Sequence, residues 1–245
     1  MTAEMTRFQK LVNASNNSVF FGGAGVSTES GIPDFRGENG IYNIQKTYGD
    51  PAEKILSRPF FDEQPERFFE FYRQEMVYLD AKPNTAHFAL ARLELMGKLK
   101  AVITQNIDGL HQMAGSSKVL ELHGSIHRNY CMNCGKFFDL DYMMKAETVP
   151  RCNLCGNKIK PDVVLYQEGL DDDVFRKSAK AISEAEVLII GGTSLNVYPA
   201  AGLIRYFKGR ALVLINKSET PYDSQADLVI HDSIGKVLGE VTKNI

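Results

Sequence analysis

The fold of this chain is decided by residues 19–36, which read VFFGGAGVSTESGIPDFR. The first three residues, Val19 to Phe21, are apolar and predict a strand. Three of the next four residues are glycines, and the run from Ser27 to Ser30 has the composition of a helix start. A strand, a glycine turn and a helix start form the usual site for a nucleotide phosphate, because backbone N–H groups and a helix N-terminus attract anions. An ordinary tight turn has a similar local sequence, so the rest of the chain must show whether this stretch binds a phosphate.

Length and composition set limits on the fold and on the partners. The 245 residues are enough for one domain, or for one domain with a small additional module. A net charge of −2 gives no reason to expect a nucleic-acid partner or an acidic membrane surface. The chain has no apolar run of about 18 residues and no apolar leader within residues 1–9. We therefore expect a cytoplasmic protein without membrane contacts.

Strand and helix patterns alternate along the chain. Helices are expected around Phe8 to Val12, in the aromatic-rich segment 51–79, and from residue 83 to Gly97. The aromatic segment is either a small helical core or an apolar wall over a cofactor. Short apolar strands are expected at residues 101–104, 119–122, 187–190 and 211–215, with a helix at 199–207. This alternation predicts an α/β fold in which helices cover both faces of a parallel sheet.

Four of the expected strands end in unusual loops, and ligands gather beyond the carboxyl ends of strands in such sheets. Two of the loops are rich in glycine and two carry amide or hydroxyl groups, which suit phosphate and ribose oxygens. The loops are residues 22–25, 105–109, 191–194 and 216–218. Together they predict a nucleotide or dinucleotide site. Thr28 stands where the third glycine of the dehydrogenase fingerprint would be, which argues against hydride transfer.

The four cysteines form two C-x-x-C pairs, residues 131–134 and 152–155, which are separated by seventeen residues. A glycine follows each pair and permits a tight turn around the thiolates. This spacing matches tetrahedral zinc held by Cys131, Cys134, Cys152 and Cys155. Disulfides are the alternative, which a cytoplasmic setting disfavours. Four thiolates leave no open coordination position, so the metal would be structural, and His127 is a much weaker candidate ligand.

The histidines include a candidate general base. His123 follows the expected strand at 119–122, so its imidazole would lie at a carboxyl strand end, with a pKa suited to proton transfer. A structural role for His123 is equally open at this point. His111 is a candidate neighbour of the binding site, whereas His87 suits packing or helix capping and His231 is expected at the surface.

Taken together, these motifs resemble those of the sirtuin family of NAD-dependent protein deacylases. Four blocks carry the resemblance: GAGVS continued through GIPDFR (residues 23–36), TQNID (104–108), His123-Gly124 and the double cysteine pair. KPDVV (160–164) and GTSL (192–195), with Val197 and Pro199, add to it. The blocks span nearly the whole chain and have the order that the family shows.

The resemblance implies a Rossmann-like domain with an inserted zinc ribbon and an inserted helical module. The Rossmann-like domain would comprise residues 1–43, 83–126 and 161–245, the helical module residues 44–82, and the zinc-binding module residues 127–160. NAD would lie in the cleft between the large domain and the modules. Residues 37–40 are expected to form a loop.

The resemblance also implies which residues hold NAD. Ala24, Thr28 and Arg36 would contact the phosphates and the nearby ribose. Phe35 would cover the nicotinamide, and the pair 107–108 would hold its carboxamide. The pair 105–106 would face the nicotinamide ribose and a bound water. The full expected set is Gly23, Ala24, Gly25, Thr28, Phe35, Arg36, Gln105, Asn106, Ile107, Asp108, His123, Gly192, Thr193, Ser194, Asn216, Lys217 and Ile234, of which the last five would line the adenosine end.

The implied reaction removes an acyl group from a protein lysine, consumes NAD, and yields nicotinamide and acyl-ADP-ribose. His123 would take a proton from a ribose hydroxyl, and Asn106 is the second residue expected to act in catalysis. Val163, Val164, Leu165 and Tyr166 would form a strand that pairs with the substrate peptide, the alternative being a plain edge strand.

One departure bears on the acyl group. Family members that prefer succinyl or malonyl lysine share a Tyr-x-x-Arg pair in the helical module. In this chain the residue three positions after Tyr72 is Glu75, and the residue three positions after Tyr78 is Ala81. We therefore expect acetyl or longer neutral acyl groups. Two other interpretations stay open. One is ADP-ribosyl transfer or NAD hydrolysis on the same fold, and the other is a non-catalytic zinc-ribbon adaptor that senses NAD.

Overall fold

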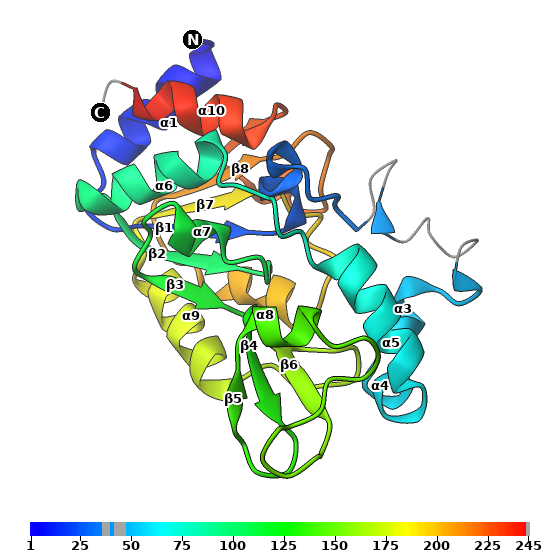
Figure 1. The fold of residues 1–245 in the computed structure, drawn as a ribbon. Helices are drawn as coiled ribbons and strands as arrows, with labels where there is room; N and C mark the ends of the chain where they lie inside the picture. Colours follow the sequence, from blue (N-terminus) through cyan, green and yellow to red (C-terminus); the bar gives the residue numbers. More distant parts are fainter. Residues whose placement is uncertain (36–39, 42–47, 244–245) are drawn as a thin grey trace.

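Six parallel strands form the main sheet of the protein (Figure 1). The computed structural model describes residues 1–35, 40–41 and 48–243. Within these residues the strands, in spatial order, are β3 (Val119–Glu121), β2 (Leu99–Thr104), β1 (Ser18–Gly22), β7 (Val187–Gly191), β8 (Ala211–Ile215) and β9 (Leu228–Ile230). The strands β1 to β3 form one half of the sheet and β7 to β9 the other, and the two halves meet where β1 lies beside β7. This is the switch point at which Rossmann-like sheets bind ligands, and the predicted fold class is confirmed.

Helices cover both faces of this sheet, because its central strands are buried throughout. Figure 1 shows α1 (Ala3–Asn13), α6 (Thr85–Leu95) and α10 (Ile234–Thr242) stacked over one face. Their buried residues pack against alternate strand residues such as Phe20 and Ile189. On the opposite face, α9 (Asp172–Glu184) and the 3-10 helix η5 (Ala200–Tyr206) pack against Phe21 and Leu188. The short elements α7 (Leu110–Met113) and η6 (Asp223–Gln225) lie in connections.

The two inserted segments form a smaller lobe. The first contributes α3 (Ala52–Ile55), α4 (Arg58–Glu63), α5 (Pro65–Phe71) and the π-helix η4 (Tyr72–Met76). The second contributes an antiparallel sheet with the order β5 (Phe137–Phe138), β4 (Gly124–Cys131) and β6 (Ile159–Val163), and the helix α8 (Leu140–Met144). Both segments share one hydrophobic core, in which Phe61 and Phe68 lie with Cys131 and Cys152. The boundaries proposed for the zinc-binding module fall inside β4 and β6, and the boundary between residues 43 and 44 lies outside the described residues. The proposed division into domains stays a prediction.

Five of the six strands of the main sheet agree with the expected strands, whereas β9 was not predicted and the helix predicted after the glycine loop is wrong. Two short 3-10 turns, η1 (Ala24–Val26) and η2 (Thr28–Ser30), follow β1 instead. Gly31 has a left-handed φ of 83°, and Pro33 lacks an N–H, so the chain cannot continue as a helix. Residues 36–39, which include Arg36 and most of the expected loop at 37–40, lie outside the described residues.

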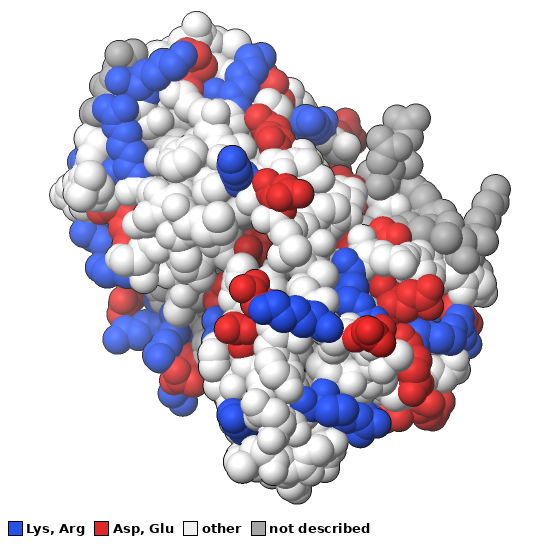
Figure 2. All heavy atoms as spheres, in the orientation of Figure 1, with Lys and Arg blue, Asp and Glu red and all other residues white. Residues whose placement is uncertain are grey.

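The surface carries charges of both signs. On the face drawn in Figure 2, lysine and arginine side chains are interspersed with aspartate and glutamate, in agreement with the net charge of −2. Within the part of the chain that the structure describes, we find no helix that is both long and apolar enough to cross a membrane.

Two histidines are buried in the large domain. His87 caps the start of α6, where its Nδ1 accepts a hydrogen bond from the N–H of Asn84 (3.2 Å), which confirms the capping role expected for it. Its ring lies 4.7 Å from the ring of His111, which is also buried. Burial lowers the pKa of His87 to about 4 and that of His111 to about 3. Both imidazoles are therefore neutral in the folded protein at pH 7.

This pair predicts a loss of stability in mild acid. Unfolding releases both imidazoles to their ordinary pKa of 6.5, so the stabilisation is complete above pH 6.5 and is lost as the pH falls toward 4. Each group contributes about 1.4 kcal/mol per pH unit to this dependence. Urea unfolding at several pH values should give a shallower slope for His111→Gln than for the wild type. The exposed His231→Gln variant is the control, and equal slopes for His111→Gln and the wild type would contradict the prediction.

Candidate functional site

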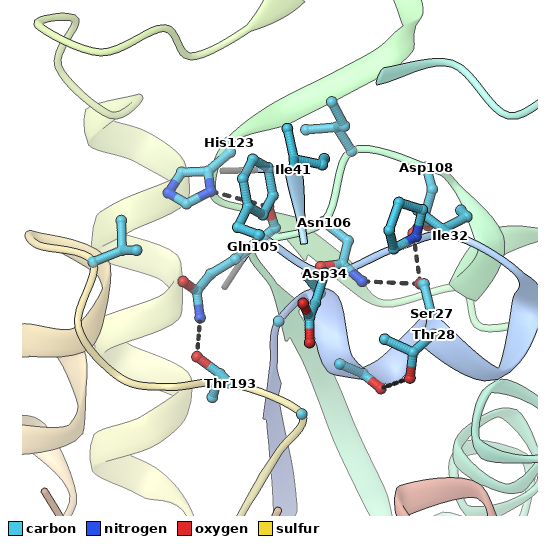
Figure 3. Close-up of a pocket in the computed structure, with 18 of the residues that line it drawn as sticks. Ser27, Thr28, Ile32, Asp34, Ile41, Gln105, Asn106, Asp108, His123 and Thr193 are labelled. Carbon is cyan, nitrogen blue, oxygen red and sulfur yellow. Dashed lines mark hydrogen bonds between the residues drawn. The ribbon is translucent and has the colours of Figure 1, made fainter. Parts of the chain in front are cut away.

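A cavity of about 780 Å³ lies where the carboxyl ends of the main strands face the smaller lobe. Figure 3 shows part of it, with side chains from the segments that follow β1, β2, β3 and β7 converging on one space. Every described residue that the sequence analysis assigned to NAD or to the peptide lines this cavity. These residues are Gly23, Ala24, Gly25, Thr28, Phe35, Gln105, Asn106, Ile107, Asp108, His123, Val163, Val164, Leu165, Tyr166, Gly192, Thr193, Ser194, Asn216, Lys217 and Ile234.

The glycine loops after β1 and β7 touch along their backbones. The N–H of Gly25 donates to the carbonyl of Gly192 (2.8 Å), and the N–H of Gly23 donates to that of Gly191 (3.4 Å). A Cβ atom at Gly25 would lie 2.8 Å from the Cα of Gly192, so only glycine permits this contact. Both glycine N–H groups thus hold the loops together, whereas the N–H of Ala24 has no partner among the described residues.

A chain of polar side chains ties the loop after β2 to the first glycine loop (Figure 3). The amide of Asn106 donates to the hydroxyl of Ser27 (3.0 Å), which donates to the carboxylate of Asp108 (2.6 Å). The other carboxylate oxygen of Asp108 accepts from the N–H of Leu110 (2.9 Å). Ser27 was not among the predicted site residues, although it lies inside the stretch that carried the resemblance. Its role depends on a residue 81 positions away, which local sequence does not reveal.

One ring nitrogen of His123 is fixed by a hydrogen bond, and the other has no partner among the described residues. Its Nδ1 lies 2.9 Å from the carbonyl oxygen of Gln105. A carbonyl can only accept, so Nδ1 carries the proton and Nε2 holds the lone pair of a neutral imidazole. Burial lowers the pKa of His123, and the bond to Gln105 opposes this shift in part. The amide of Gln105 donates to the hydroxyl of Thr193 (3.1 Å), so the residue that holds His123 is also linked to the loop after β7.

The expected adenosine end is built around the start of α10. Glu29, from the turn η2, accepts a hydrogen bond from the N–H of Gly235 (2.9 Å) in the first turn of this helix. Glu29 and Ile234 both line the cavity, and Asn216 folds back so that its amide donates to the carbonyl of Ser218 (2.8 Å). The sequence analysis did not identify Glu29, because its partner lies 206 residues away.

The segment 163–166 lines the cavity, but the expectation that it forms one strand is wrong. β6 ends at Val163. Beyond it, the N–H of Val164 donates to the carbonyl of His123 (3.0 Å), and the N–H of Tyr166 donates to that of Leu56 (2.9 Å). These two hydrogen bonds join the loop that carries His123 to the helical segment.

The other histidines divide between the cavity, the core and the surface. His111 does not itself line the cavity, because its ring is buried against Phe20 and His87, although the adjacent Leu110 is a lining residue. His231 is exposed and pairs with Asp223 (3.2 Å), as expected of a surface residue. His127 lines the cavity and donates from Nε2 to the carbonyl of Asp108 (3.0 Å).

The four cysteines converge on one point in the smaller lobe. Their sulfurs lie within 4.8 Å of one another, and the closest pairs are 3.3 to 3.6 Å apart. Tetrahedral zinc with bonds of about 2.3 Å requires sulfurs about 3.8 Å apart, so the set fits this ion. Gly135 and Gly156 have φ values of 69° and 73°, which confirms the tight turns expected after each pair. All four cysteines are free of disulfides, and His127 is not part of the cluster.

The position of the cysteines predicts what metal loss would do. Cys131 and Cys152 lie in the core that the helices α4 and α5 also share, so loss of the ion should loosen the whole smaller lobe. Cys131→Ser should reduce bound zinc from about one ion per chain to nearly none, and should speed amide hydrogen exchange in α4 and α5. Asn133→Ser, in the same turn, is the matched control. Full zinc content in Cys131→Ser, or unchanged exchange in these helices, would contradict the prediction.

Comparisons with known proteins agree with this geometry. The profile of the Sir2 family matches residues 23–199. A Clostridium acetobutylicum protein named NAD-dependent protein deacetylase is 64% identical over 239 residues, which cover 97% of this chain and 98% of that protein. A Clostridium perfringens protein of the same name is 59% identical over 98% of this chain and 99% of that protein.

Solved structures of Sir2 proteins are also similar to this chain. A Sir2 variant bound to deacetylated p53 peptide and 3′-O-acetyl-ADP-ribose has a TM-score of 0.89 and 41% identity, with 98% of both chains covered. Sir2 bound to p53 peptide and NAD⁺ has a TM-score of 0.88 and 39% identity, and covers 100% of this chain and 98% of that one. The resemblance found in the sequence is confirmed, and the chain belongs to the Sir2 family.

Proposed function

We propose that this protein is an NAD-dependent protein-lysine deacetylase that yields nicotinamide and O-acetyl-ADP-ribose. The observation that carries the proposal is the neutral His123, whose Nδ1–H is held by the Gln105 carbonyl in a cavity that the glycine loops also line. The activity in the names of the relatives supports the same function. Acylated-lysine proteins are the substrates under this proposal. The four cysteines must stay reduced to hold zinc, which favours a reducing compartment, and we propose the cytoplasm.

NAD would lie along the carboxyl ends of the main strands. When bound, it supplies a ribose carbon that accepts the acyl oxygen of the lysine substrate as nicotinamide leaves. The N–H of Ala24, which has no partner within the described part of the chain, and the hydroxyl of Thr28 face its phosphates in our proposal, and Arg36 keeps the same predicted role. Ile107 and Asp108 hold the nicotinamide carboxamide. At the other end, the adenosine would meet Thr193, Ser194, Asn216, Lys217 and Ile234.

His123 would act as the general base toward a ribose hydroxyl. Its free Nε2 accepts the proton, while the Nδ1–H bond to Gln105 stabilises the ring as it becomes charged. Asn106 is held by Ser27 and so presents its amide carbonyl toward the same region. Phe35 and Ile107 pack against the core of the smaller lobe, so they give the reacting end an apolar wall that excludes water.

The charges of the cavity favour a neutral acyl group. Among its described lining residues there is no arginine, and the lysine is Lys217, at the proposed adenosine end. Glu75 lines the cavity from the helical segment, where it accepts a hydrogen bond from Tyr48 (2.8 Å). A succinyl or malonyl carboxylate would meet a like charge there and find no cationic partner. We therefore propose acetyl and other neutral acyl groups as substrates.

Replacing His123 tests the proposed function. Wild-type protein with an acetyl-lysine peptide and NAD should form nicotinamide, deacetylated peptide and acetyl-ADP-ribose. His123→Ala should lose at least about 100-fold in kcat while its affinity for NAD stays within a few-fold, and the exposed His231→Ala should behave as the wild type. Because burial lowers the pKa of His123, the acid limb of the pH–kcat profile should fall below pH 6.5. ADP-ribose attached to protein, with no acetyl-ADP-ribose, would contradict the proposal.

The acyl preference can be tested by reversing one charge. Wild-type protein should prefer acetyl over succinyl peptides by at least about 10-fold in kcat/KM, because one unpaired carboxylate costs more than about 1.4 kcal/mol. Glu75→Arg should lower the ratio of kcat/KM for the acetyl peptide to kcat/KM for the succinyl peptide. Asp80→Arg makes the same change of charge nearby at an exposed position outside the cavity lining, and should leave the ratio unchanged. An equal effect of both variants would show that long-range charge, rather than Glu75, sets the preference.

A further inference from the structure

The loop after β2 is held by two consecutive residues of β4. The N–H of Ile126 donates to the carbonyl of Ile107 (3.1 Å). The ring of His127 donates from Nε2 to the carbonyl of Asp108 (3.0 Å), because a carbonyl can only accept. The backbone of β4 therefore fixes one carbonyl of this loop, and a side chain of β4 fixes the next.

The ring of His127 also lies directly against Gly109, the next residue of the loop. Gly109 has a left-handed φ of 73°. A Cβ atom at this position would lie 2.8 Å from both Cδ2 and Nε2 of His127, so a side chain here would displace the ring. Both the backbone and the ring therefore require glycine. His127 is exposed, yet its ring fits closely against this loop.

Asp108 is held at its carbonyl and at its carboxylate. The hydrogen bonds from Ile126 and His127 fix the two peptide planes that flank Asp108, because a peptide unit is planar and turns as one body. The carboxylate accepts from the hydroxyl of Ser27 (2.6 Å, Figure 3) and from the N–H of Leu110 (2.9 Å). Without the ring of His127, the peptide plane that follows Asp108 would lose the hydrogen bond to its carbonyl.

The groups that this arrangement leaves unpaired suit a carboxamide. The N–H groups of Ile107 and Asp108 have no partner among the described residues, and both residues line the cavity. An ionised carboxylate offers about four acceptor positions, so Asp108 keeps acceptor capacity beyond its two bonds. A primary amide has an acceptor oxygen and an NH₂ donor, so it can pair with both kinds of group.

We propose that His127 is a positioning residue for the nicotinamide end of NAD. It acts by holding Asp108 and Gly109 in the orientation in which Ile107 and Asp108 meet the carboxamide, and it takes no part in the chemical steps. Its loss should weaken the binding of ligands that carry nicotinamide and spare those that lack it. This inference rests on the proposed function, because it takes NAD as the occupant of the cavity.

Ligands with and without nicotinamide test this role. In carba-NAD a methylene group replaces the ribose ring oxygen, so nicotinamide is not released and binding can be measured by calorimetry with acetyl-lysine peptide present. His127→Ala should bind carba-NAD about 3- to 10-fold more weakly than the wild type, as for one lost neutral hydrogen bond. ADP-ribose should bind both proteins equally. His127→Gln keeps an N–H donor on its side chain and should recover most of the loss.

Turnover gives an independent measurement. In His127→Ala, the KM for NAD and the inhibition constant of nicotinamide should rise together by about 3- to 10-fold. The kcat and the KM for the peptide should stay within about two-fold, because the lost interaction serves binding rather than a chemical step. A residue with a purely structural role would change all four quantities.

Arg128→Gln is the matched control. Arg128 follows His127 in β4 and pairs with Glu121 and Asp162, outside the cavity lining, so this variant should bind both ligands as the wild type does. Equal affinity of wild type and His127→Ala for carba-NAD, or equal weakening of carba-NAD and ADP-ribose, would overturn the inference. The predicted binding pattern in a protein that does not deacetylate the peptide would contradict the proposed function and leave the role of His127 supported.

Discussion

The site depends on the close approach of two backbone loops at the centre of the sheet. The N–H of Gly25 donates to the carbonyl of Gly192 at 2.8 Å, and a methyl group at Gly25 would collide with the backbone of Gly192 in the other loop. This contact brings the ends of the neighbouring strands β1 and β7 together and forms one continuous floor. Ala24 and Thr193 then lie along the same cavity. A larger residue at Gly25 would separate the loops and with them the two ends of the proposed NAD site.

The remaining parts of the site are attached to this floor through backbone carbonyls. Gln105 bonds to Thr193 with its side chain and to His123 with its carbonyl, so the base is positioned relative to the glycine loops. The backbone of His123 then accepts the N–H of Val164, which connects it to the peptide segment. Cys131 and Cys152 share one hydrophobic core with Val163 and Leu165, so the cysteine cluster and the segment proposed to bind the peptide are packed together.

The sequence was most informative where chemistry is local. Apolar runs predicted the main strands, and the cysteine spacing predicted a cluster that the structure brings within 4.8 Å. The sequence was misleading where contacts between distant residues determine the structure. His111 follows a strand as His123 does, yet only packing shows that it is buried. Residues 163–166 have a strand-like pattern, but the N–H groups of Val164 and Tyr166 bond to two different segments, at His123 and Leu56. A positive φ at Gln167 is invisible in the sequence, because glutamine gives no signal for it.

The central claim is that this single cavity couples the cleavage of NAD to the removal of an acyl group from lysine. The most direct measurement is the amount of nicotinamide released per acetyl group removed, with and without peptide. The account predicts one nicotinamide for each acetyl group, and negligible release when the peptide is absent. Nicotinamide release at the same rate without peptide, or removal of acetyl groups without NAD, would contradict it.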